Sequence, residues 1–378
     1  MRRAIDDLLA QAPVSRAAVD AFLDRHDFPL VEGRQATFVY RGDAEAVRLR
    51  HWIYGLPTAQ PFHRVPGTDL WYFLLDLPPG SRVEYKLEIE RGDHNEWICD
   101  PLNPTLAHDP FGANSVCQAT GYVRPLWSEP RADARRGTLE ELELTDTPFG
   151  DTRRVSVYLP ARFRPTRRYQ LLIVHDGGDY LEFASLLTVL DNLIDDLEVA
   201  PLIVALTYPD ERLVEYPNYE PHCRFLSEQL VPTLEARYPL ITTPGARGLM
   251  GASFGAVASL ATAWRYPGRF GNLLLQSGSF AFTDIGTHNR GPAFDPVVEF
   301  VNAFRQAPGR PAEHVFVSCG AYESLIYENR TMVPLLQSTG MSVRYAEAPD
   351  GHNWENWRDR LRVALSWLFP GPLWMVYE

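Results

Sequence analysis

The chain has 378 residues, 45% hydrophobic and 12% aromatic, which is enough for a sizeable core in one large or two unequal domains. Its 36 basic and 48 acidic residues give a formal net charge of −12, and no run rich in Lys or Arg occurs. This balance argues against nucleic acid or an anionic membrane surface as a partner. We expect a cytoplasmic protein, because the N-terminus has acids where a signal peptide is apolar and no apolar run reaches about 18 residues.

The first 30 residues predict an N-terminal helical segment. Residues 15–26 begin with the capping residue Ser15 and place Ala18, Phe22 and Arg25 at helical spacing. This pattern is typical of a short amphipathic helix.

Residues 31–125 predict a β-sandwich of the immunoglobulin-like kind. Short runs of β-forming residues alternate with Gly, Pro and Asp turns, and the clearest are 36–40, 47–53, 70–74 and 83–89. A linker with two prolines follows at residues 124–130, so we expect a domain boundary near residue 125.

Residues 126–378 predict a catalytic α/β domain. Nearly unbroken apolar strands alternate there with helical segments, at 154–159, 171–174, 202–206, 249–250, 272–275, 315–317 and 342–345. Strands of this kind are typical of a mostly parallel sheet covered by helices on both faces.

The pentapeptide 251–255, Gly-Ala-Ser-Phe-Gly, is the strongest functional motif. It lies between an apolar strand and a helical run rich in small residues, which is the order that a nucleophile elbow requires. Glycines at 251 and 255 would let strand and helix approach closely around a strained Ser253. The backbone N–H of Phe254 would then point at the oxyanion formed on an attacked carbonyl.

A serine nucleophile needs a base and an acid from loops that follow later strands. Glu323 and His352 both come directly after predicted strands, in the expected chain order. Asp350 is a rival acid and Glu347 a weaker one, but both are so close in sequence to His352 that orienting its ring would be awkward. The second oxyanion donor is expected from the loop after the third strand, where we choose the N–H of Gly178.

Each choice also has a purely structural alternative. A histidine chosen by position alone is often a structural residue, and the paired glycines at 177 and 178 could form a simple tight turn. The aromatic residues Tyr180 and Trp357 could belong to a stacking wall for a phenolic ligand, but core packing explains them equally well.

Together these motifs resemble the enterochelin esterase family. The likeness rests on 251–256 (Gly-Ala-Ser-Phe-Gly-Ala), 276–279 (Gln-Ser-Gly-Ser), 320–323 (Gly-Ala-Tyr-Glu) and 351–352 (Gly-His), in that order. At the front end, 100–104 (Asp-Pro-Leu-Asn-Pro) and 112–115 (Gly-Ala-Asn-Ser) are similar to the family's β-rich N-terminal domain. The resemblance implies an α/β-hydrolase domain of the esterase D type behind that domain.

The resemblance also implies an activity and a set of roles. It implies hydrolysis of the ester bonds of a ferric catecholate siderophore trilactone of the enterobactin type, with release of iron. In that reading Ser253 is the nucleophile, His352 the base and Glu323 the acid, and Arg212 lies near an anionic substrate. The sequence departs from the family at His175, where an apolar residue is more usual.

Two other classes of function stay open. Related esterase D folds act on carbohydrate or phenolic esters, so a feruloyl or acetyl ester is the first alternative. The second is a carbohydrate-binding or interaction protein with a non-catalytic hydrolase fold. We expect a small-molecule ester as partner, with no metal and no organic cofactor, and make no prediction of oligomeric state.

Overall fold

The computed structural model describes residues 2–284 and 288–372. The chain forms two compact units. The first contains the chain up to Val123 together with two returning segments, Gly320–Glu323 and Ala348–Asn353. The second contains the rest of the chain from Arg124 onward.

Two antiparallel sheets form the body of the first unit. The smaller has the strand order β1 (Leu30–Glu32), β2 (Gln35–Arg41), β6 (Leu70–Asp76), β5 (His63–Arg64). The larger has the order β4 (Ala59–Pro61), β3 (Ala46–His51), β7 (Arg82–Arg91), β10 (Gly112–Gln118), β9 (Leu106–Asp109), and β8 (His94–Ile98) also pairs with β7. The predicted sandwich-like arrangement of antiparallel sheets is confirmed.

The core of the first unit follows from strand periodicity. Successive side chains of a strand point to opposite faces, so alternate residues of β7 enter one apolar cluster. Val83, Tyr85, Leu87 and Ile89 are buried in this way and pack in one cluster with Phe38 of β2. The ring of Phe38 meets that of Tyr85 edge to face, with centroids 4.8 Å apart.

Helices α1 (Ala4–Leu9) and α2 (Arg16–Arg25) pack against the smaller sheet. Val19 and Phe22 of α2 are buried with Val39 and Leu70 of the sheet. These four residues belong to a cluster separate from the one that contains Phe38 and Tyr85. The hydroxyl of Ser15 accepts a hydrogen bond from the N–H of Ala18 at 3.1 Å and caps α2.

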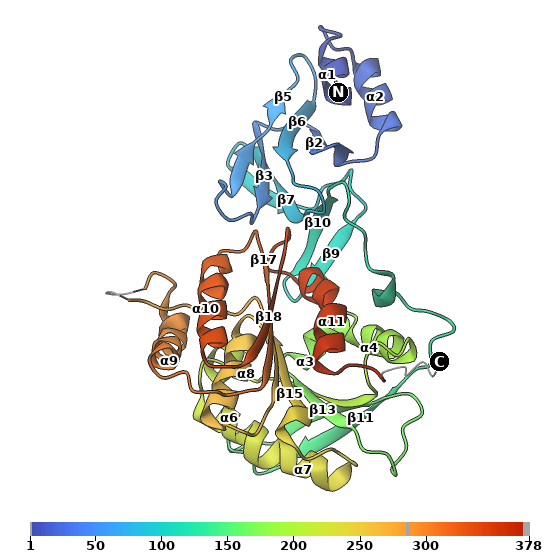
Figure 1. Ribbon diagram of the computed structural model, residues 1–378. Helices are drawn as coiled ribbons and strands as arrows, with labels where there is room; N and C mark the ends of the chain where they lie inside the picture. Colours follow the sequence, from blue (N-terminus) through green and yellow to red (C-terminus); the bar gives the residue numbers. More distant parts are fainter. Residues whose placement is uncertain (1, 285–287, 373–378) are drawn as a thin grey trace. The chain divides into compact units, whose positions relative to one another are not determined.

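The second unit is built on an eight-stranded sheet (Figure 1). Its strand order is β11 (Thr138–Leu144), β12 (Arg153–Leu159), β14 (Leu202–Thr207), β13 (Gln170–Val174), β15 (Arg247–Ala252), β16 (Asn272–Gln276), β17 (His314–Gly320), β18 (Ser342–Ala348). β11 and β12 pair antiparallel, whereas the ladder from β14 through β13, β15 and β16 to β17 is parallel. The predicted mostly parallel sheet is confirmed.

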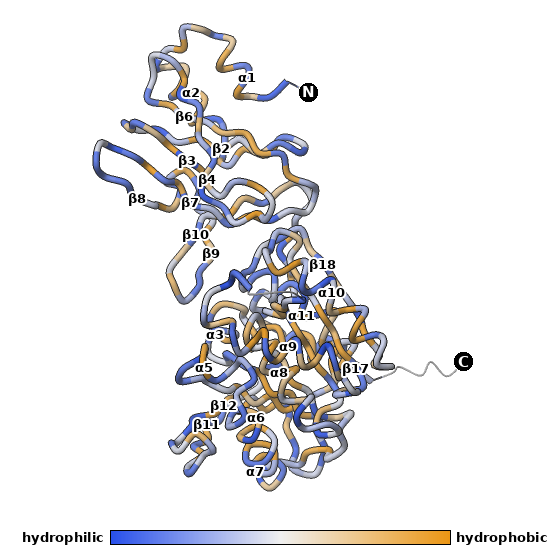
Figure 2. Tube along the Cα trace, turned by 90° about the vertical axis from the view of Figure 1, so that its left-hand side faces the viewer, coloured by the Kyte–Doolittle hydropathy of each residue, from blue (hydrophilic) through white to orange (hydrophobic). Residues whose placement is uncertain are grey.

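Helices cover both faces of this sheet, as Figure 1 shows. α3 (Gly177–Glu182), α4 (Leu186–Asp195) and α11 (Trp354–Leu368) share one apolar cluster. The helical segments of the other face are α6 (Glu220–Arg224), the π-helical turn Phe225–Leu230, α7 (Val231–Arg237), α8 (Phe254–Arg265), α9 (Asp295–Gln306) and α10 (Ile326–Ser338). In β16, Leu273 and Leu275 face that cluster and Leu274 faces the first. Figure 2 shows the hydrophobic colouring concentrated around α8.

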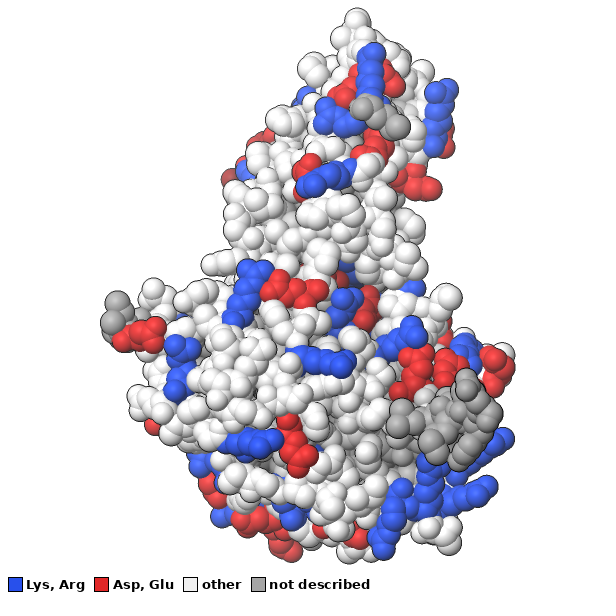
Figure 3. Space-filling view, viewed as in Figure 1, with Lys and Arg blue, Asp and Glu red and all other residues white. Residues whose placement is uncertain are grey.

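The surface of each unit carries acidic and basic side chains close together (Figure 3). Arg34 pairs with Asp76 in the first unit, and Arg330 pairs with Glu347 in the second. Across the described ranges, no helix is both long and apolar enough to span a lipid bilayer.

Candidate active site

Ser253 lies at the sharp turn between β15 and α8. It has φ 58° and ψ −120°, a backbone conformation that non-glycine residues rarely adopt. Its N–H donates to the carbonyl of Gln276 at 2.9 Å, which ties the turn to the neighbouring strand β16. This geometry is typical of the nucleophile elbow of α/β-hydrolases.

The glycines on either side of Ser253 are required by the close approach of strand and helix. A Cβ atom on Gly251 would lie 2.4 Å from the carbonyl carbon and oxygen of Gly255. A Cβ atom on Gly255 would lie 3.2 Å from the Cβ of His175. The pattern of small residues therefore has a steric cause in this fold.

The hydroxyl of Ser253 has a side-chain neighbour that sequence reasoning missed. Its Oγ lies 3.1 Å from the Oγ of Ser279, which is buried in the segment after β16. In the sequence, Ser279 was noted only as part of the motif 276–279 that resembles the family. A serine after a strand is too common to predict a role in the site. It can accept or donate and so helps to orient Ser253.

Phe254 and Gly178 both lie in the first turn of a helix. Phe254 is the first residue of α8, and Gly178 is the second residue of α3. N–H groups of a first helical turn have no partner within their own helix. These helices follow β15 and β13, which pair in parallel. Both helices therefore begin at the carboxyl ends of neighbouring strands, on the same side of the sheet.

The acid and the base are in direct contact within the first unit. Glu323 Oε2 lies 2.7 Å from His352 Nδ1, and Glu323 Oε1 accepts the N–H of Gly320 at 2.7 Å. The Glu323 side chain is fully buried, whereas that of His352 is 38% exposed. A carboxylate can only accept, so Nδ1 carries the proton and Nε2 has the lone pair that a general base needs.

Asp350 is engaged by other groups. Its Oδ1 accepts from the N–H of Gly351 at 2.7 Å and from the Asn353 amide at 2.8 Å, and it lies 3.4 Å from Arg82 Nη1. Burial raises the pKa of Asp350 to about 6, although the charge of Arg82 and these hydrogen bonds act in the opposite direction. The structure thus places Glu323 on the imidazole and gives Asp350 a role in its own loop.

Arg212, in the short helix α5 (Arg212–Glu215), turns toward the protein. Its Nε and Nη2 bind the two oxygens of Asp176 at 2.9 and 2.8 Å, and Nη2 lies 3.3 Å from the carbonyl of Ala252. We expected this side chain to meet an anionic substrate. Its contacts with Asp176 and Ala252 tie together the residues beside the elbow, and its place near an anionic substrate stays a prediction.

Tyr180 and Trp357 are core residues. Tyr180 is fully buried and donates its hydroxyl to Gln276 Oε1 at 2.7 Å. Trp357 is 6% exposed and donates its indole N–H to Ser277 Oγ at 2.9 Å. The sequence left a stacking wall or core packing open for these residues, and their burial supports core packing.

Two buried histidines lie behind the elbow. His175 Nδ1 is 3.0 Å from the carbonyl of Met250, and His175 Nε2 is 3.0 Å from His222 Nε2. The carbonyl requires a proton on His175 Nδ1, so His222 must donate through its own Nε2. Burial lowers the pKa of His175 to about 4 and that of His222 well below its ordinary value, so both rings are neutral.

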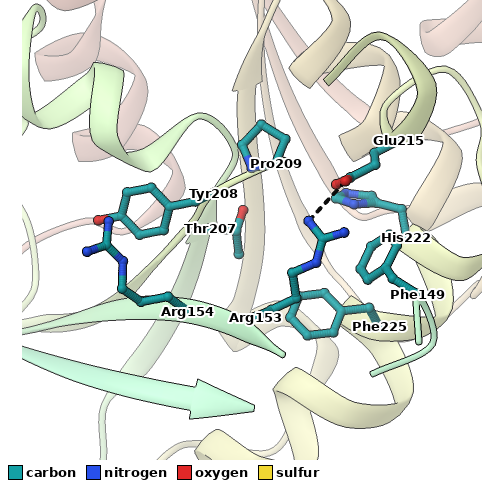
Figure 4. A pocket seen from close by; sticks show the side chains of 9 residues that line it. All are labelled: Phe149, Arg153, Arg154, Thr207, Tyr208, Pro209, Glu215, His222 and Phe225. Atoms are coloured by element: carbon teal, nitrogen blue, oxygen red, sulfur yellow. Dashed lines mark ion pairs between the residues drawn. The ribbon is translucent and has the colours of Figure 1, made fainter. Parts of the chain in front are cut away.

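His222 also lines a small pocket (Figure 4). It is lined by Phe149, Arg153, Arg154, Thr207, Tyr208, Pro209, Glu215, His222 and Phe225. Arg153 Nη1 pairs with Glu215 at 2.9 Å, and its guanidinium lies 4.0 Å from the centroid of the Phe149 ring. The charges of Arg153 and Glu215 in this pocket are therefore paired with each other.

Comparison with known proteins places this geometry in context. Residues 147–368 match the model of the Esterase family, described as "Putative esterase". An iron(III) enterobactin esterase of Dickeya dadantii (strain 3937) is 25% identical over 353 residues, which cover 82% of this chain and 80% of the relative. The uncharacterized protein YjcH of Bacillus subtilis (strain 168) is 26% identical over 239 residues, which cover 61% of this chain and 98% of the relative.

The fold is shared with solved structures. The ferric enterobactin esterase of Salmonella typhimurium superposes with a TM-score of 0.73 at 21% identity, covering 88% of this chain and 93% of that one. The expected α/β-hydrolase fold behind a β-rich N-terminal domain is confirmed, as is the resemblance to the enterochelin esterases.

Proposed function

Because this chain belongs to the Esterase family and is a carboxylic ester hydrolase, we propose that Ser253 is its nucleophile, His352 its general base and Glu323 its acid. The observation that carries the proposal is the strained conformation of Ser253, φ 58° and ψ −120°, between β15 and α8. An ordinary strand-to-helix connection does not require such strain. Strained backbone conformations of this kind are concentrated at functional sites.

The chemistry follows from the proposed roles. Nε2 of His352 takes the proton from Ser253 Oγ as the hydroxyl attacks the ester carbonyl, and Glu323 stabilises the imidazolium that forms. The N–H groups of Phe254 and Gly178 donate to the oxyanion. His352 then protonates the leaving alcohol, and water repeats the cycle on the acyl-enzyme. The mechanism requires Nε2 of His352 to come within hydrogen-bonding distance of Ser253 Oγ.

For the substrate we propose a catecholate siderophore trilactone of the enterobactin type, either ferric or iron-free. The proposal is supported by relatives named iron(III) enterobactin esterase that align with more than three quarters of this chain. Ferric ion is cargo of the substrate in this scheme and takes no part in acyl transfer. A feruloyl or acetyl carbohydrate ester is the competing substrate class.

A substrate panel with two variants tests the proposal. Purified protein is incubated with ferric and iron-free enterobactin, p-nitrophenyl butyrate, ethyl ferulate and acetylated xylan, and product masses are recorded. We expect the trilactone to have the highest kcat/KM, and Ser253→Ala to lower kcat by about 10⁶-fold while folding normally. A preference for the ferulate or the xylan would overturn the substrate, and a folded wild type without turnover on any ester would overturn the mechanism.

A further inference from the structure

The two segments that carry the acid and the base are bonded to each other. The N–H of Ala321 donates to the carbonyl of Ala348 at 2.7 Å, and the N–H of Tyr322 donates to the carbonyl of Asp350 at 3.1 Å. Glu323 directly follows Tyr322, and His352 lies two residues after Asp350. Anything that holds Tyr322 and Asp350 therefore also holds the catalytic pair.

Arg82, at the start of β7 in the N-terminal sandwich, binds the segment of the base. Its backbone N–H donates to the carbonyl of Pro349 at 3.0 Å. Its Nη1 lies 3.1 Å from Asn353 Oδ1 and 3.4 Å from Asp350 Oδ1. Since only 3% of the Arg82 side chain is exposed, water cannot replace these contacts.

The charges around Arg82 make it difficult to replace. Both Nη atoms also bind Glu84 Oε1 at 3.0 Å, so one guanidinium serves two carboxylates. The side chains of Glu84 and Asp350 are only 9% and 6% exposed. Without Arg82 these carboxylates would repel each other in a buried site, which would disturb the segment that carries Asp350.

The sandwich holds the segment of the acid in a similar way. The hydroxyl of Ser81 lies 2.5 Å from the hydroxyl of Tyr322, and the N–H of Tyr54 donates to the carbonyl of Tyr322 at 2.8 Å. Ser81 is fully buried. Adjacent residues of the sandwich, Ser81 and Arg82, thus bind one segment each.

We propose that Arg82 is a positioning residue of the reaction, which sets the geometry of the Glu323–His352 pair from the N-terminal sandwich with the help of Ser81. The inference rests on the proposed roles of Glu323 and His352. In this proposal the sandwich takes part in catalysis, because it positions the acid–base pair. If the sandwich were only a ligand-binding module, residues of the α/β unit would position that pair.

The test compares Arg82→Gln with Arg48→Gln. Arg48 lies on the adjacent strand β3, is 31% exposed and pairs with the buried Glu88, which Arg50 also binds, so it is a control ion pair of the same sheet. We expect Arg82→Gln to lower kcat by about 10- to 100-fold with little change in KM, because small displacements of catalytic groups have effects of this size. Arg82→Lys, which keeps the charge, should recover part of the loss, and Arg48→Gln should stay within twofold of wild type.

A second readout does not depend on Ser253. The proton on His352 Nδ1, bound to Glu323 at 2.7 Å, should give a downfield imidazole resonance in the proton NMR spectrum. We expect Arg82→Gln to shift or broaden this resonance and Arg48→Gln to leave it unchanged. If Arg82→Gln does not fold, Tyr322→Phe replaces it, because that change removes only the hydroxyl bound to Ser81, and a several-fold loss of kcat is expected.

The outcomes separate this inference from the proposed function. Wild-type kcat and an unmoved resonance in a folded Arg82→Gln or Tyr322→Phe variant would overturn the positioning role, even if Ser253→Ala is inactive. Full activity of Ser253→Ala would instead overturn the proposed nucleophile. The NMR result would then still report whether Arg82 positions the Glu323–His352 pair.

Discussion

The guanidinium of Arg212 binds both oxygens of Asp176, with Nε 2.9 Å from Oδ1 and Nη2 2.8 Å from Oδ2. Asp176 immediately precedes α3, which carries Gly178, and has a left-handed backbone with φ 53°. Arg212 also reaches the carbonyl of Ala252, the residue before Ser253. One side chain therefore joins the two loops that supply the proposed nucleophile and oxyanion donors.

The first prediction concerns this ion pair. Arg212→Gln leaves the Asp176 carboxylate, 3% exposed, without its cation, so we expect a loss of roughly 2 to 4 kcal/mol in the free energy of unfolding, together with a lower kcat. Arg330→Gln is the matched control, because Arg330 binds Glu347 with two bonds of 2.7 Å while 55% exposed. It should change stability by at most about 1 kcal/mol. Urea unfolding measures the stability of both variants. Equal losses in the free energy of unfolding would show that the Arg212–Asp176 pair contributes no more than an exposed ion pair.

The second prediction concerns the approach of β15 to α8. In Gly251→Ala the new methyl group meets the backbone of Gly255, and because that contact cannot be relieved by a side-chain rotation, strand and helix must separate. We expect a loss of roughly 1 to 3 kcal/mol and a fall in kcat of about 100-fold.

The control for this variant is Gly245→Ala, whose methyl group would meet only the end of the Glu313 side chain at 3.1 Å. It should keep wild-type kcat and stability within about 0.5 kcal/mol. Thermal unfolding and steady-state kinetics measure both variants. An active, stable Gly251→Ala would show that the elbow is not tightly packed.

The third prediction concerns pH and the pair His175–His222. Burial depresses the pKa of both rings, that of His175 from 6.5 to about 4, so the folded state binds fewer protons than the unfolded state below pH 6.5. Stability from these groups is thus present above pH 6.5 and lost as pH falls toward 4. The free energy of unfolding should fall by up to about 1.4 kcal/mol per pH unit for each ring.

His222→Gln tests this assignment, because its amide can still donate to His175 Nε2 but cannot titrate. Urea unfolding at several pH values between 6.5 and 4 should show a smaller slope for this variant than for wild type. His94→Gln, at an exposed position, serves as the control. An unchanged slope in His222→Gln would mean that this pair does not control acid stability.

The fourth prediction identifies the acid. Glu323→Gln keeps the shape of the side chain but removes the charge that stabilises the imidazolium of His352, so kcat should fall by about 10³- to 10⁴-fold. Asp350→Asn weakens the contact with Arg82 that holds the segment of the base, and we expect a loss of at most about 100-fold, as for Arg82→Gln. Steady-state kinetics with p-nitrophenyl butyrate measures both. A larger effect of Asp350→Asn would transfer the role of the acid to Asp350.

Much of the fold could be predicted because its signals are local. Alternation along β7 indicated a strand with one buried face, and the apolar run of β16 indicated a strand buried on both faces. The elbow was also predictable, because the two glycines and the serine that cause its geometry lie within five residues.

Other features depend on contacts between residues far apart in the sequence. Arg82 and Asp350 are 268 residues apart, and His175 and His222 are 47 apart, so neither pair leaves a local pattern. Tyr180 followed a predicted strand, where a substrate-facing residue is common, but periodicity could not show that its ring is buried beside Trp354. Arg212 was singled out by the family resemblance, and only the structure identified Asp176 as its partner.

The most direct test of the account is to trap the nucleophile. Wild-type protein, Ser253→Ala and His352→Gln are treated with a fluorophosphonate, and the modified peptide is identified by mass spectrometry. We expect one adduct in wild type, on Ser253, none in Ser253→Ala, and much slower labelling in His352→Gln because the base is missing. An adduct on another residue that accompanies the loss of esterase activity, or ester hydrolysis that survives in Ser253→Ala, would contradict the account.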